Sequence, residues 1–368
     1  MLTARPHLVL ALALASLAAC RDGARASTRE TPARRVSFAR VAFDAHGVSA
    51  PLRVTVPPAT RSLAVVAEGD ARALYALARL ETADGVEHVA LPDGVDVPSA
   101  MRAAYFDDRS GEMPGDLRQS IRLGLFTLIF PDRPGVALPP GDAELRIATS
   151  APSATVSVQV LLPEDTGGRL LPVNIFTVSR EAAALAPRDP DALPFVAPLA
   201  AILAAGGVDL RVERVIPLRE EQLAAMTELS EPQEPPGSAS ARLALEGGAM
   251  TGGDALNLFV IDSLPRGVGG WTLGTPGPPL PDTYYSGVVA ARLDGGTELA
   301  RVLAHEICHY LGLWHVQHRS HSGALHLDPL DDTETGTGNL MDEEGRGTSL
   351  TPDQSFVLAR HPLLRALQ

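Results

Sequence analysis

Residues 305–315 read HEICHYLGLWH and carry three imidazoles and one carboxylate. On a helix, His305 and His309 are four residues apart and share one face, so both rings can reach one metal ion at about 2.0–2.1 Å. Glu306 lies one position further round, where its carboxylate can reach a water at the metal without being a ligand. Gly312 can adopt a positive φ, which ends the helix and lets His315 approach the same metal. The stretch predicts a zinc site with Glu306 as general base; the alternative is a solvated, histidine-rich helix without metal.

The residues before this stretch predict how its helix begins. Val288 and Val289, within residues 287–293, indicate a strand, and residues 294–296 (Asp-Gly-Gly) indicate a turn. Thr297 then has the side chain of an N-cap, with Glu298 in the first turn. We therefore expect the metal-binding helix to follow Thr297 as its N-cap.

The pattern His-Glu-x-x-His-x-x-Gly-x-x-His resembles that of the metzincin clan of zinc endopeptidases, and residues 339–342 (Asn-Leu-Met-Asp) resemble that clan's Met-turn. Within the clan, Asp332-Thr333 before this turn and the residues Leu350-Thr351-Pro352-Asp353-Gln354, opening a last helix, are most similar to the pappalysin family. The resemblance covers roughly the second half of the chain. It implies zinc on His305, His309 and His315, Glu306 as the base and Met341 beneath the metal.

One position departs from the family pattern. Pappalysin-like chains usually carry Tyr two residues after the Met, where it supports the transition state, and this chain has Glu343. Either another donor, such as Tyr284 or Tyr285, serves in its place, or the enzyme is slower. Without the upstream motif, Met341 itself would be interpreted as an ordinary core methionine.

Histidines and acidic residues gather around the motif. His318, His321 and His326 are predicted to be solvated loop residues, with a second metal site or a substrate contact as the alternative. The acidic residues near the Met-turn are Asp328, Asp331, Asp332, Glu334, Asp342, Glu343 and Glu344. We expect them to form a solvated face. The alternatives are a Ca²⁺ site and a negative pocket for a basic substrate side chain, which is consistent with the arginine preference among pappalysin-like enzymes.

Cys308 is expected to fill a small gap in the core. Cys20 and Cys308 are the two cysteines of the chain, so the region between them has no thiolate that could silence a zinc ion as a cysteine-switch propeptide does. Residues 269–274 contain Trp271. In metzincins an edge strand in this part of the fold pairs with extended substrate, so Trp271 belongs either to a substrate cleft or to a packed surface cluster.

The first 20 residues predict a bacterial lipoprotein signal. A short basic region at Arg5 precedes the apolar run from Leu8 to Ala19, which is too short to span a bilayer, and Leu17-Ala18-Ala19-Cys20 resembles a lipobox. Cleavage would leave Cys20 as the lipidation site, and residues 21–35 would be a flexible tether. Arg21 favours the outer membrane of a Gram-negative bacterium, and thus an extracytoplasmic, lipid-anchored protein. The alternative is a plain secretory signal with an incidental cysteine.

The rest of the chain predicts two domains. Residues 36–165 show runs of period two, such as Leu52, Val54 and Val56, separated by Pro and Gly, which favours an all-β sandwich. Residues 168–368 favour an α+β metzincin-like catalytic domain, with strands at 171–178, 208–218 and 255–261, a helix at 191–205 that contains Pro194 and Pro198, and a long loop at 231–253. No further segment has transmembrane length. The net charge of −13 argues against nucleic acid as a partner.

These features together predict a lipid-anchored zinc endopeptidase that acts on a peptide or protein substrate. Two alternatives remain open. One is a zinc hydrolase of another bond. The other is a lipid-anchored binding or adhesion protein, in which the sandwich is the functional part and the protease half is degenerate.

Overall fold

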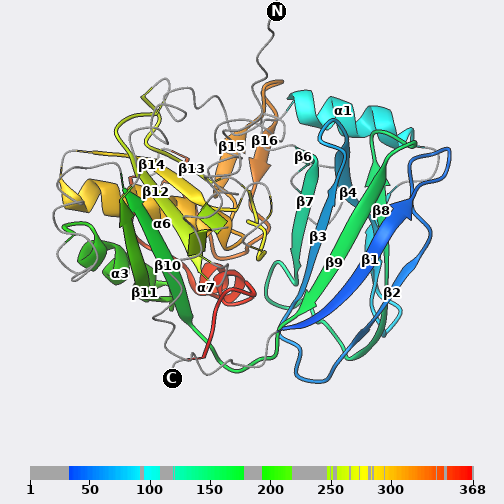
Figure 1. Ribbon diagram of the computed structural model, residues 1–368, viewed down its shortest axis with the longest axis horizontal. Coiled ribbons are helices and arrows are strands. Elements are labelled where there is room, and N and C mark those ends of the chain that lie inside the picture. The colour runs from blue at the N-terminus through cyan, green and yellow to red at the C-terminus, as the bar shows by residue number, and fades with distance from the viewer. Residues whose placement is uncertain are drawn as a thin grey trace, which may run out of the picture. The chain divides into compact units, whose positions relative to one another are not determined.

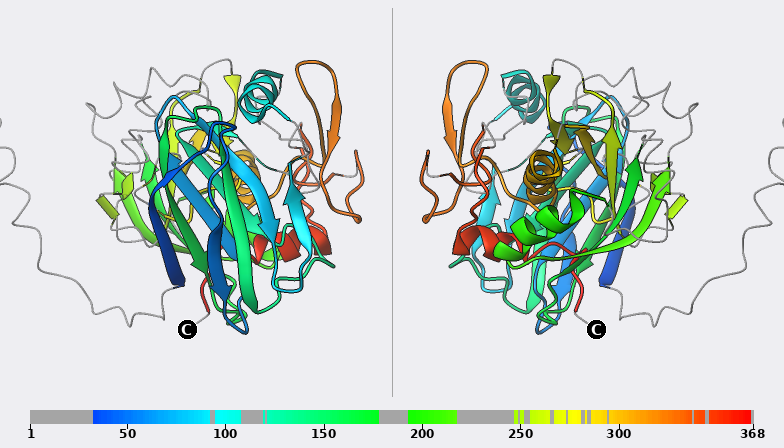
Figure 2. Two further views of the ribbon diagram at one scale, coloured as in Figure 1. Left: turned by 90° about the vertical axis from the view of Figure 1, so that its right-hand side faces the viewer. Right: turned by 90° about the vertical axis from the view of Figure 1, so that its left-hand side faces the viewer.

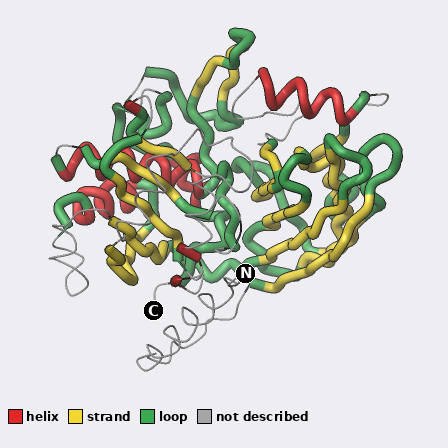
Figure 3. The backbone as a smooth tube through the Cα atoms, turned by 45° about the horizontal axis from the view of Figure 1, so that its top comes forward, coloured by secondary structure: helices red, strands yellow, loops and turns green. Residues whose placement is uncertain are grey.

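The computed structural model describes residues 33–366 except 92–94, 108–118, 120, 178–192, 218–246, 249, 252–254, 265–266, 273, 281–282, 284–285, 294, 337 and 344–345. The segment Ala33–Gln368 forms one compact unit. In the described part of the chain strands predominate and helices are few (Figure 3). The prediction of a mixed α+β fold is confirmed.

Two antiparallel sheets lie in the first half of the described chain. The first has the order β1-β9-β3-β7, from β1 (Arg34–Ala42), β9 (Thr155–Leu162), β3 (Leu63–Gly69) and β7 (Leu125–Phe130). The second has the order β2-β8-β4-β5, from β2 (Leu52–Val56), β8 (Gly141–Thr149), β4 (Leu74–Glu81) and β5 (Glu87–Ala90), with β6 (Arg122–Leu123) also paired to β4.

Alternation along each strand explains why the two sheets pack together. In β2, Leu52, Val54 and Val56 are buried while Arg53 and Thr55 are exposed. Strands of both sheets contribute such residues to one hydrophobic core, as expected of a sandwich. Helix α1 (Val97–Asp107) covers the other face of the second sheet, where Met101 packs with alanines of β4 and β8.

The second half contains a five-stranded mixed sheet with the order β11-β10-β12-β14-β13. Its strands are β10 (Leu170–Thr177), β11 (Asp209–Pro217), β12 (Leu256–Ile261), β13 (Gly270–Thr272) and β14 (Val288–Ala291). The first four in this order are mutually parallel, and β13 pairs antiparallel to β14 at the edge. The expected strands therefore exist within about two residues of the expected bounds; Val178 and Leu218 lie outside the described residues.

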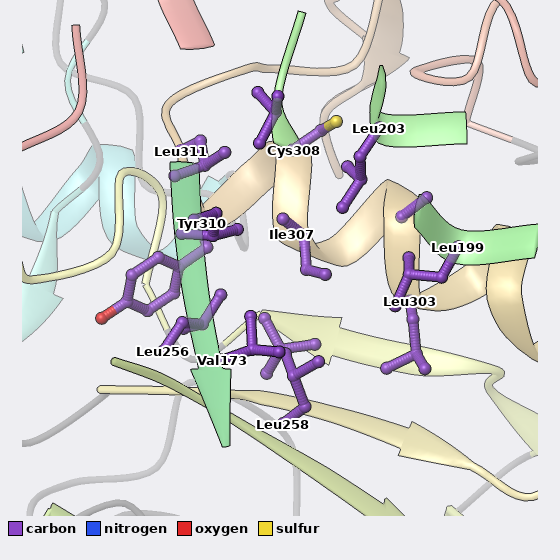
Figure 4. Packing of buried hydrophobic residues seen from close by; sticks show 14 of the residues in the cluster. Val173, Leu199, Leu203, Leu256, Leu258, Leu303, Ile307, Cys308, Tyr310 and Leu311 are labelled. Atoms are coloured by element: carbon purple, nitrogen blue, oxygen red, sulfur yellow. The ribbon is translucent and has the colours of Figure 1, made fainter. Parts of the chain in front are cut away.

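Helices cover one face of this sheet. Helix α3 (Val196–Ala205) packs on α6 (Gly296–Tyr310), and α6 lies against β13 and β14. Figure 4 shows Leu303 and Ile307 of α6 among Val173, Leu258 and the leucines of α3, which belong to one buried cluster. Each such buried side chain contributes about 1.5–3 kcal/mol to stability.

The sandwich covers the opposite face of the same sheet. Val288 and Ala290 of β14 face the helices, whereas Val289 and Ala291 pack with Ala64, Val66 and other residues of the first sandwich sheet. The right-hand view of Figure 2 shows α3 and α6 in front of the sandwich strands, and Figure 1 labels the strands involved. Because both faces are buried, the central strands are apolar at nearly every position rather than alternating.

A short hairpin and a short helix follow α6. Strands β15 (Gln317–Arg319) and β16 (Leu325–Leu327) form a hairpin, and α7 (Pro352–Leu358) is the last helix. Thr351 caps α7 in a capping box with Gln354, which confirms the helix expected after Leu350. No helix in the described part of the chain is long and apolar enough to cross a membrane.

Three local predictions need correction. Helix α3 begins at Val196 rather than Asp191, and Pro198 then lies in the first turn, where a missing N–H costs no intrahelical bond. Helix α6 begins at Gly296 with Gly295 as N-cap, so the predicted N-cap at Thr297 is wrong. The physical reason is packing, since a Cβ at Gly296 would lie 2.4 Å from the backbone oxygen of Pro194.

The third correction concerns the predicted loop at 231–253. Its described residues, 247–251 apart from 249, are helical. The remainder of that prediction lies outside the described residues.

Candidate metal centre

The end of α6 is built by Gly312. Helix α6 ends at Tyr310, and Gly312 follows with φ 115°. The Leu313 N–H donates to the Cys308 oxygen across 2.9 Å and the Gly312 N–H donates to the His309 oxygen across 3.0 Å, which is the Schellman pattern. The predicted turn at Gly312 is confirmed, and it leads the chain back toward the helix face that carries His305 and His309.

Three imidazoles converge beyond this turn. The Nε2 atom of His309 lies 3.1 Å from Nε2 of His305 and 3.1 Å from Nε2 of His315, and the third separation is 3.2 Å. His305 is buried, and His309 and His315 are half-buried. In the described part of the chain they form the only group of three or more His, Cys, Asp or Glu side chains able to hold one metal ion.

Backbone carbonyls determine where two of these rings carry their protons. His305 Nδ1 lies 2.6 Å from the Leu340 oxygen, and His309 Nδ1 lies 2.7 Å from the Leu313 oxygen. A carbonyl oxygen can only accept, so both Nδ1 atoms donate, and the Nε2 atoms of the neutral rings carry lone pairs. Two lone pairs facing each other at 3.1 Å repel, and two imidazolium ions would repel more strongly. A cation between the rings removes this repulsion, so the residues fit a metal ion.

The turn at Met341 contacts the candidate ligands and their neighbours through its backbone. The Leu340 oxygen holds His305, and the Met341 oxygen accepts a hydrogen bond from the N–H of Val316, the residue after His315. Met341 itself is fully buried in the core shared with α6. The turn thus holds the His305 ring directly, and it holds the backbone of Val316 next to His315.

A buried amide pair supports this turn. Asn339 Nδ2 donates to Gln354 Oε1 across 2.9 Å, and Gln354 Nε2 donates back to Asn339 Oδ1 across 3.1 Å. Asn339 Oδ1 also accepts from the Met341 N–H at 2.8 Å. Because Gln354 is the capping-box residue of α7, the turn and the last helix are held as one structure.

Glu306 is buried next to His305. Burial raises the pKa of its carboxyl, while nearby His305 and a hydrogen bond from Thr272 act to lower it. Thr272 Oγ1, on β13, lies 2.7 Å from Glu306 Oε2. Glu306 is thus placed next to the candidate metal ligand His305, and one of its carboxylate oxygens is already contacted by the protein.

Other predicted residues lie away from the centre. Trp271 packs in the cluster between the mixed sheet and the sandwich, on the face opposite α6, which favours the packed aromatic over the substrate cleft. Glu343 is exposed in a turn. Cys308 is buried in the core and burial raises the pKa of its thiol, which confirms its packing role. Tyr284, Tyr285 and Cys20 lie outside the described residues.

The prediction of solvated loop histidines is wrong for two of three. His318 and His326 are partners across the hairpin β15–β16, and their rings stack with centroids 4.9 Å apart. His318 is buried, and its ring lies 6.5 Å from that of His315. Only His321, in the turn of the hairpin, is exposed as expected. Cross-strand pairing, which loop composition does not reveal, buries His318 and leaves His326 half-buried.

Two of the acidic residues near the turn accept hydrogen bonds from neighbouring groups. Asp328 Oδ1 accepts from the Thr333 hydroxyl at 2.6 Å, and Asp332 Oδ2 accepts from the Asp353 N–H at 3.0 Å. Asp331, Asp332, Glu334 and Glu343 are exposed, as a solvated face requires. Calcium binding and a pocket for a basic substrate side chain stay predictions.

Comparisons with known proteins give no family for this chain. No family model matches the sequence, and no curated protein matches it at a significant level. Among solved structures, an active site mutant of a family two carbohydrate esterase from Clostridium thermocellum in complex with celluohexase is 9% identical. That likeness covers 90% of this chain and 97% of that chain with a TM-score of 0.16. This score is too low to indicate a common fold, and no argument rests on it.

Sequence reasoning missed Thr272 and Gly270, which both contact Glu306. They are two residues apart on β13, with Trp271 between them on the other face. The available signal was this alternation, because residues i and i+2 of a strand share a face. This alternation predicts a contact with Glu306 only if β13 is already known to lie against α6.

Proposed function

We propose that this chain is a zinc-dependent endopeptidase with a metzincin-like, pappalysin-like catalytic half. The observation that carries the proposal is the convergence of three Nε2 atoms 3.1–3.2 Å apart, with Glu306 next to the first ligand. Two of the three rings are oriented by backbone carbonyls. A buried carboxylate beside such a set is the arrangement that hydrolysis needs.

The ligand set and its spacing favour zinc. Nitrogen ligands about 2.0–2.1 Å from a tetrahedral zinc ion are about 3.3–3.4 Å apart, close to the separations of the three rings. Three protein ligands leave the fourth position open, as in catalytic rather than structural zinc sites. Imidazole is also a ligand type that zinc prefers. His305, His309 and His315 would therefore hold the ion.

Glu306 would carry the proton transfers. A bound zinc ion supplies a Lewis acid that makes a water at its open position more acidic and polarises the scissile carbonyl. Glu306 would accept the proton of that water and then deliver it to the leaving amine. Its burial favours the first step, since a raised pKa makes the carboxylate a better base than a solvated one.

The position of β13 supports a peptide substrate. This strand is an edge strand of the mixed sheet, and it lies against α6. An edge strand offers backbone N–H and C=O groups to an extended peptide, which would add a further strand near Glu306. The backbone contacts from Leu340 and Met341 support assigning residues 339–342 as the Met-turn.

The proposed location rests on sequence. Cys20 and the tether at 21–35 would anchor the protein outside the cytoplasm at the outer membrane, and the lipobox resemblance supports this. Residues 1–32 lie outside those that the structure describes.

The test uses the purified full chain, reconstituted with zinc and incubated with a peptide library. We expect cleavage that a zinc chelator abolishes and that added zinc restores. Glu306→Gln should keep zinc and lose cleavage, because the amide accepts no proton. Unchanged turnover in that variant would contradict the proposal. Zinc binding by a wild-type protein without any cleavage would favour the binding-protein alternative.

A further inference from the structure

Thr272 and Glu306 make a contact that joins the edge strand to the metal-binding helix. Thr272 Oγ1 lies 2.7 Å from Oε2 and 2.6 Å from the backbone oxygen of Glu306. Both residues are buried, at 7% and 9% exposure. They are 34 positions apart in the sequence, so the contact exists only because β13 lies against α6.

The threonine side chain is itself held firmly. Thr272 pairs with Val288 in the antiparallel ladder between β13 and β14. Its β-branched side chain has few allowed χ1 rotamers, so a fixed backbone also fixes the hydroxyl. The hydroxyl is therefore a rigid partner for the flexible side chain of Glu306.

A hydroxyl can form a hydrogen bond with a carboxyl group in either of its protonation states. It has one hydrogen to donate and lone pairs that accept. It can donate to Oε2 of the carboxylate, and it can accept from the carboxyl group while donating to the backbone oxygen. The contact therefore persists when Glu306 takes up a proton and when it returns it.

Gly270 also restrains the side chain of Glu306, by close packing. A Cβ at this position would lie 2.8 Å from Glu306 Cγ and 2.8 Å from Val302 Cγ1. Two residues earlier on the strand and on the same face as Thr272, this glycine lets the backbone approach the Glu306 side chain closely. The side chain of Glu306 is thus packed against glycine at its Cγ and bonded to threonine at its carboxylate.

We propose that Thr272 is a positioning residue for Glu306, and this rests on the proposed function. Its hydroxyl engages Oε2 and would leave Oε1 to accept the proton of the reacting water. Removing the hydroxyl frees the carboxylate to rotate while the three imidazoles stay in place. The turnover number should then fall, while zinc affinity and KM change little.

The test compares wild type with Thr272→Val, Thr272→Ser and a matched control, Thr283→Val, each as the zinc-loaded full chain. Thr283 also has a buried hydroxyl, which donates to the Leu280 oxygen at 2.8 Å without touching Glu306. For one cleaved peptide, kcat and KM are measured together with zinc affinity by competition with a chromogenic chelator. A crystal structure of zinc-loaded Thr272→Val locates the Glu306 carboxylate.

In Thr272→Val we expect kcat to fall on the order of 10- to 100-fold, as for a misplaced catalytic group. Its KM and zinc affinity should stay at the wild-type values, and its Glu306 carboxylate should be displaced. Thr272→Ser keeps the hydroxyl without the β-branch, so it should lose less kcat than Thr272→Val, and Thr283→Val should keep kcat. Wild-type kcat in Thr272→Val, a loss of kcat in Thr272→Ser as large as in Thr272→Val, or an undisplaced Glu306 would overturn the proposal.

The crystal structure also separates the two proposals. If wild type binds zinc but cleaves no peptide, the proposed function fails, and the position of Glu306 alone decides the role of Thr272. A displaced carboxylate in Thr272→Val would then still support positioning. A carboxylate in the wild-type place would overturn it.

Discussion

The backbone oxygen of Leu340 lies 2.6 Å from Nδ1 of His305, so a turn 35 residues downstream orients the first ring of the metal centre. The neighbouring Met341 oxygen holds the N–H of Val316, next to His315. Because both contacts come from backbone oxygens, the shape of the turn matters more to the ligands than the side chain at its centre. What maintains that shape is the amide of Asn339.

Asn339→Ala should destabilise the protein and weaken zinc binding together. It leaves the Met341 N–H and the Gln354 amide without their buried partner. Each such group costs about 1–3 kcal/mol, so we expect at least about 2 kcal/mol less unfolding free energy in denaturant titrations. Zinc affinity should fall about 10- to 100-fold, as when an outer-shell contact is lost.

Two variants make this result specific to the turn. Met341→Leu keeps the backbone contacts and nearly the same volume, so it should cost less than about 1.5 kcal/mol and leave zinc affinity unchanged. Ser349→Ala removes an exposed hydroxyl and should change stability by less than about 0.5 kcal/mol. If Met341→Leu weakened zinc binding as much as Asn339→Ala, the backbone account of the turn would be wrong.

The parts of this site that sequence predicted are those that depend on near neighbours. The spacing of His305 and His309, the positive φ of Gly312 and the capping box from Thr351 to Gln354 each follow from one or two helical turns. The contact from Thr272 to Glu306 depends on which strand lies at the edge of the sheet beside α6. No local pattern contains that information.

Removing the metal should lower stability, because the facing imidazoles lose the charge that holds them together. With free zinc at 100 times its Kd, the wild-type protein should gain about 2.7 kcal/mol over the chelated form. His309→Ala should show no such gain, and elemental analysis should find it free of zinc. Thermal unfolding with and without chelator measures both; a zinc-dependent melting temperature in His309→Ala would refute the three-histidine assignment.

Gly312→Ala should weaken zinc binding through backbone strain. The space around Gly312 is ordinary, with Val357 Cγ1 at 3.5 Å from an added Cβ, so the cost arises from φ 115°. Such strain is of order 1–3 kcal/mol, and relaxing it would move His315. The control is Gly135→Ala, a glycine with φ 81° and open space around it. Its stability should also fall, but its zinc affinity, measured by competition, should not; equal zinc affinity in both variants would contradict the prediction.

Long-range packing also explains why sequence misplaced the start of α6 and did not decide which way Trp271 faces. Thr297 has the better N-cap side chain, yet α6 starts earlier because Gly296 fits against Pro194 where another residue would clash. Trp271 shares its strand with Thr272 but faces the sandwich. Alternation predicts that the two side chains point apart, and only the arrangement of the sheets decides which one meets the site.

His361 links the end of the chain to the loop after β13. Its Nε2 lies 3.2 Å from the Gly277 oxygen, and its Nδ1 accepts from the Leu363 N–H at 3.2 Å. The ring also packs on Tyr310, and Arg61 lies near enough to disfavour a second charge. A ring that donates at one nitrogen and accepts at the other is neutral.

Acid should therefore destabilise the fold through His361. Burial lowers the pKa of His361 from 6.5 to about 3. Between these values the unfolded chain binds a proton that the folded chain does not, so stability is complete above pH 6.5 and falls as pH decreases toward 3. From pH 7.5 to pH 5 this loss is about 2 kcal/mol. His361→Gln retains a donor for Gly277 but cannot titrate, so its unfolding free energy should fall less than that of the wild type between pH 7.5 and pH 5. The two losses should differ by about 2 kcal/mol. Denaturant titrations at both pH values measure the difference, and parallel losses in the two proteins would show that His361 is not the group responsible.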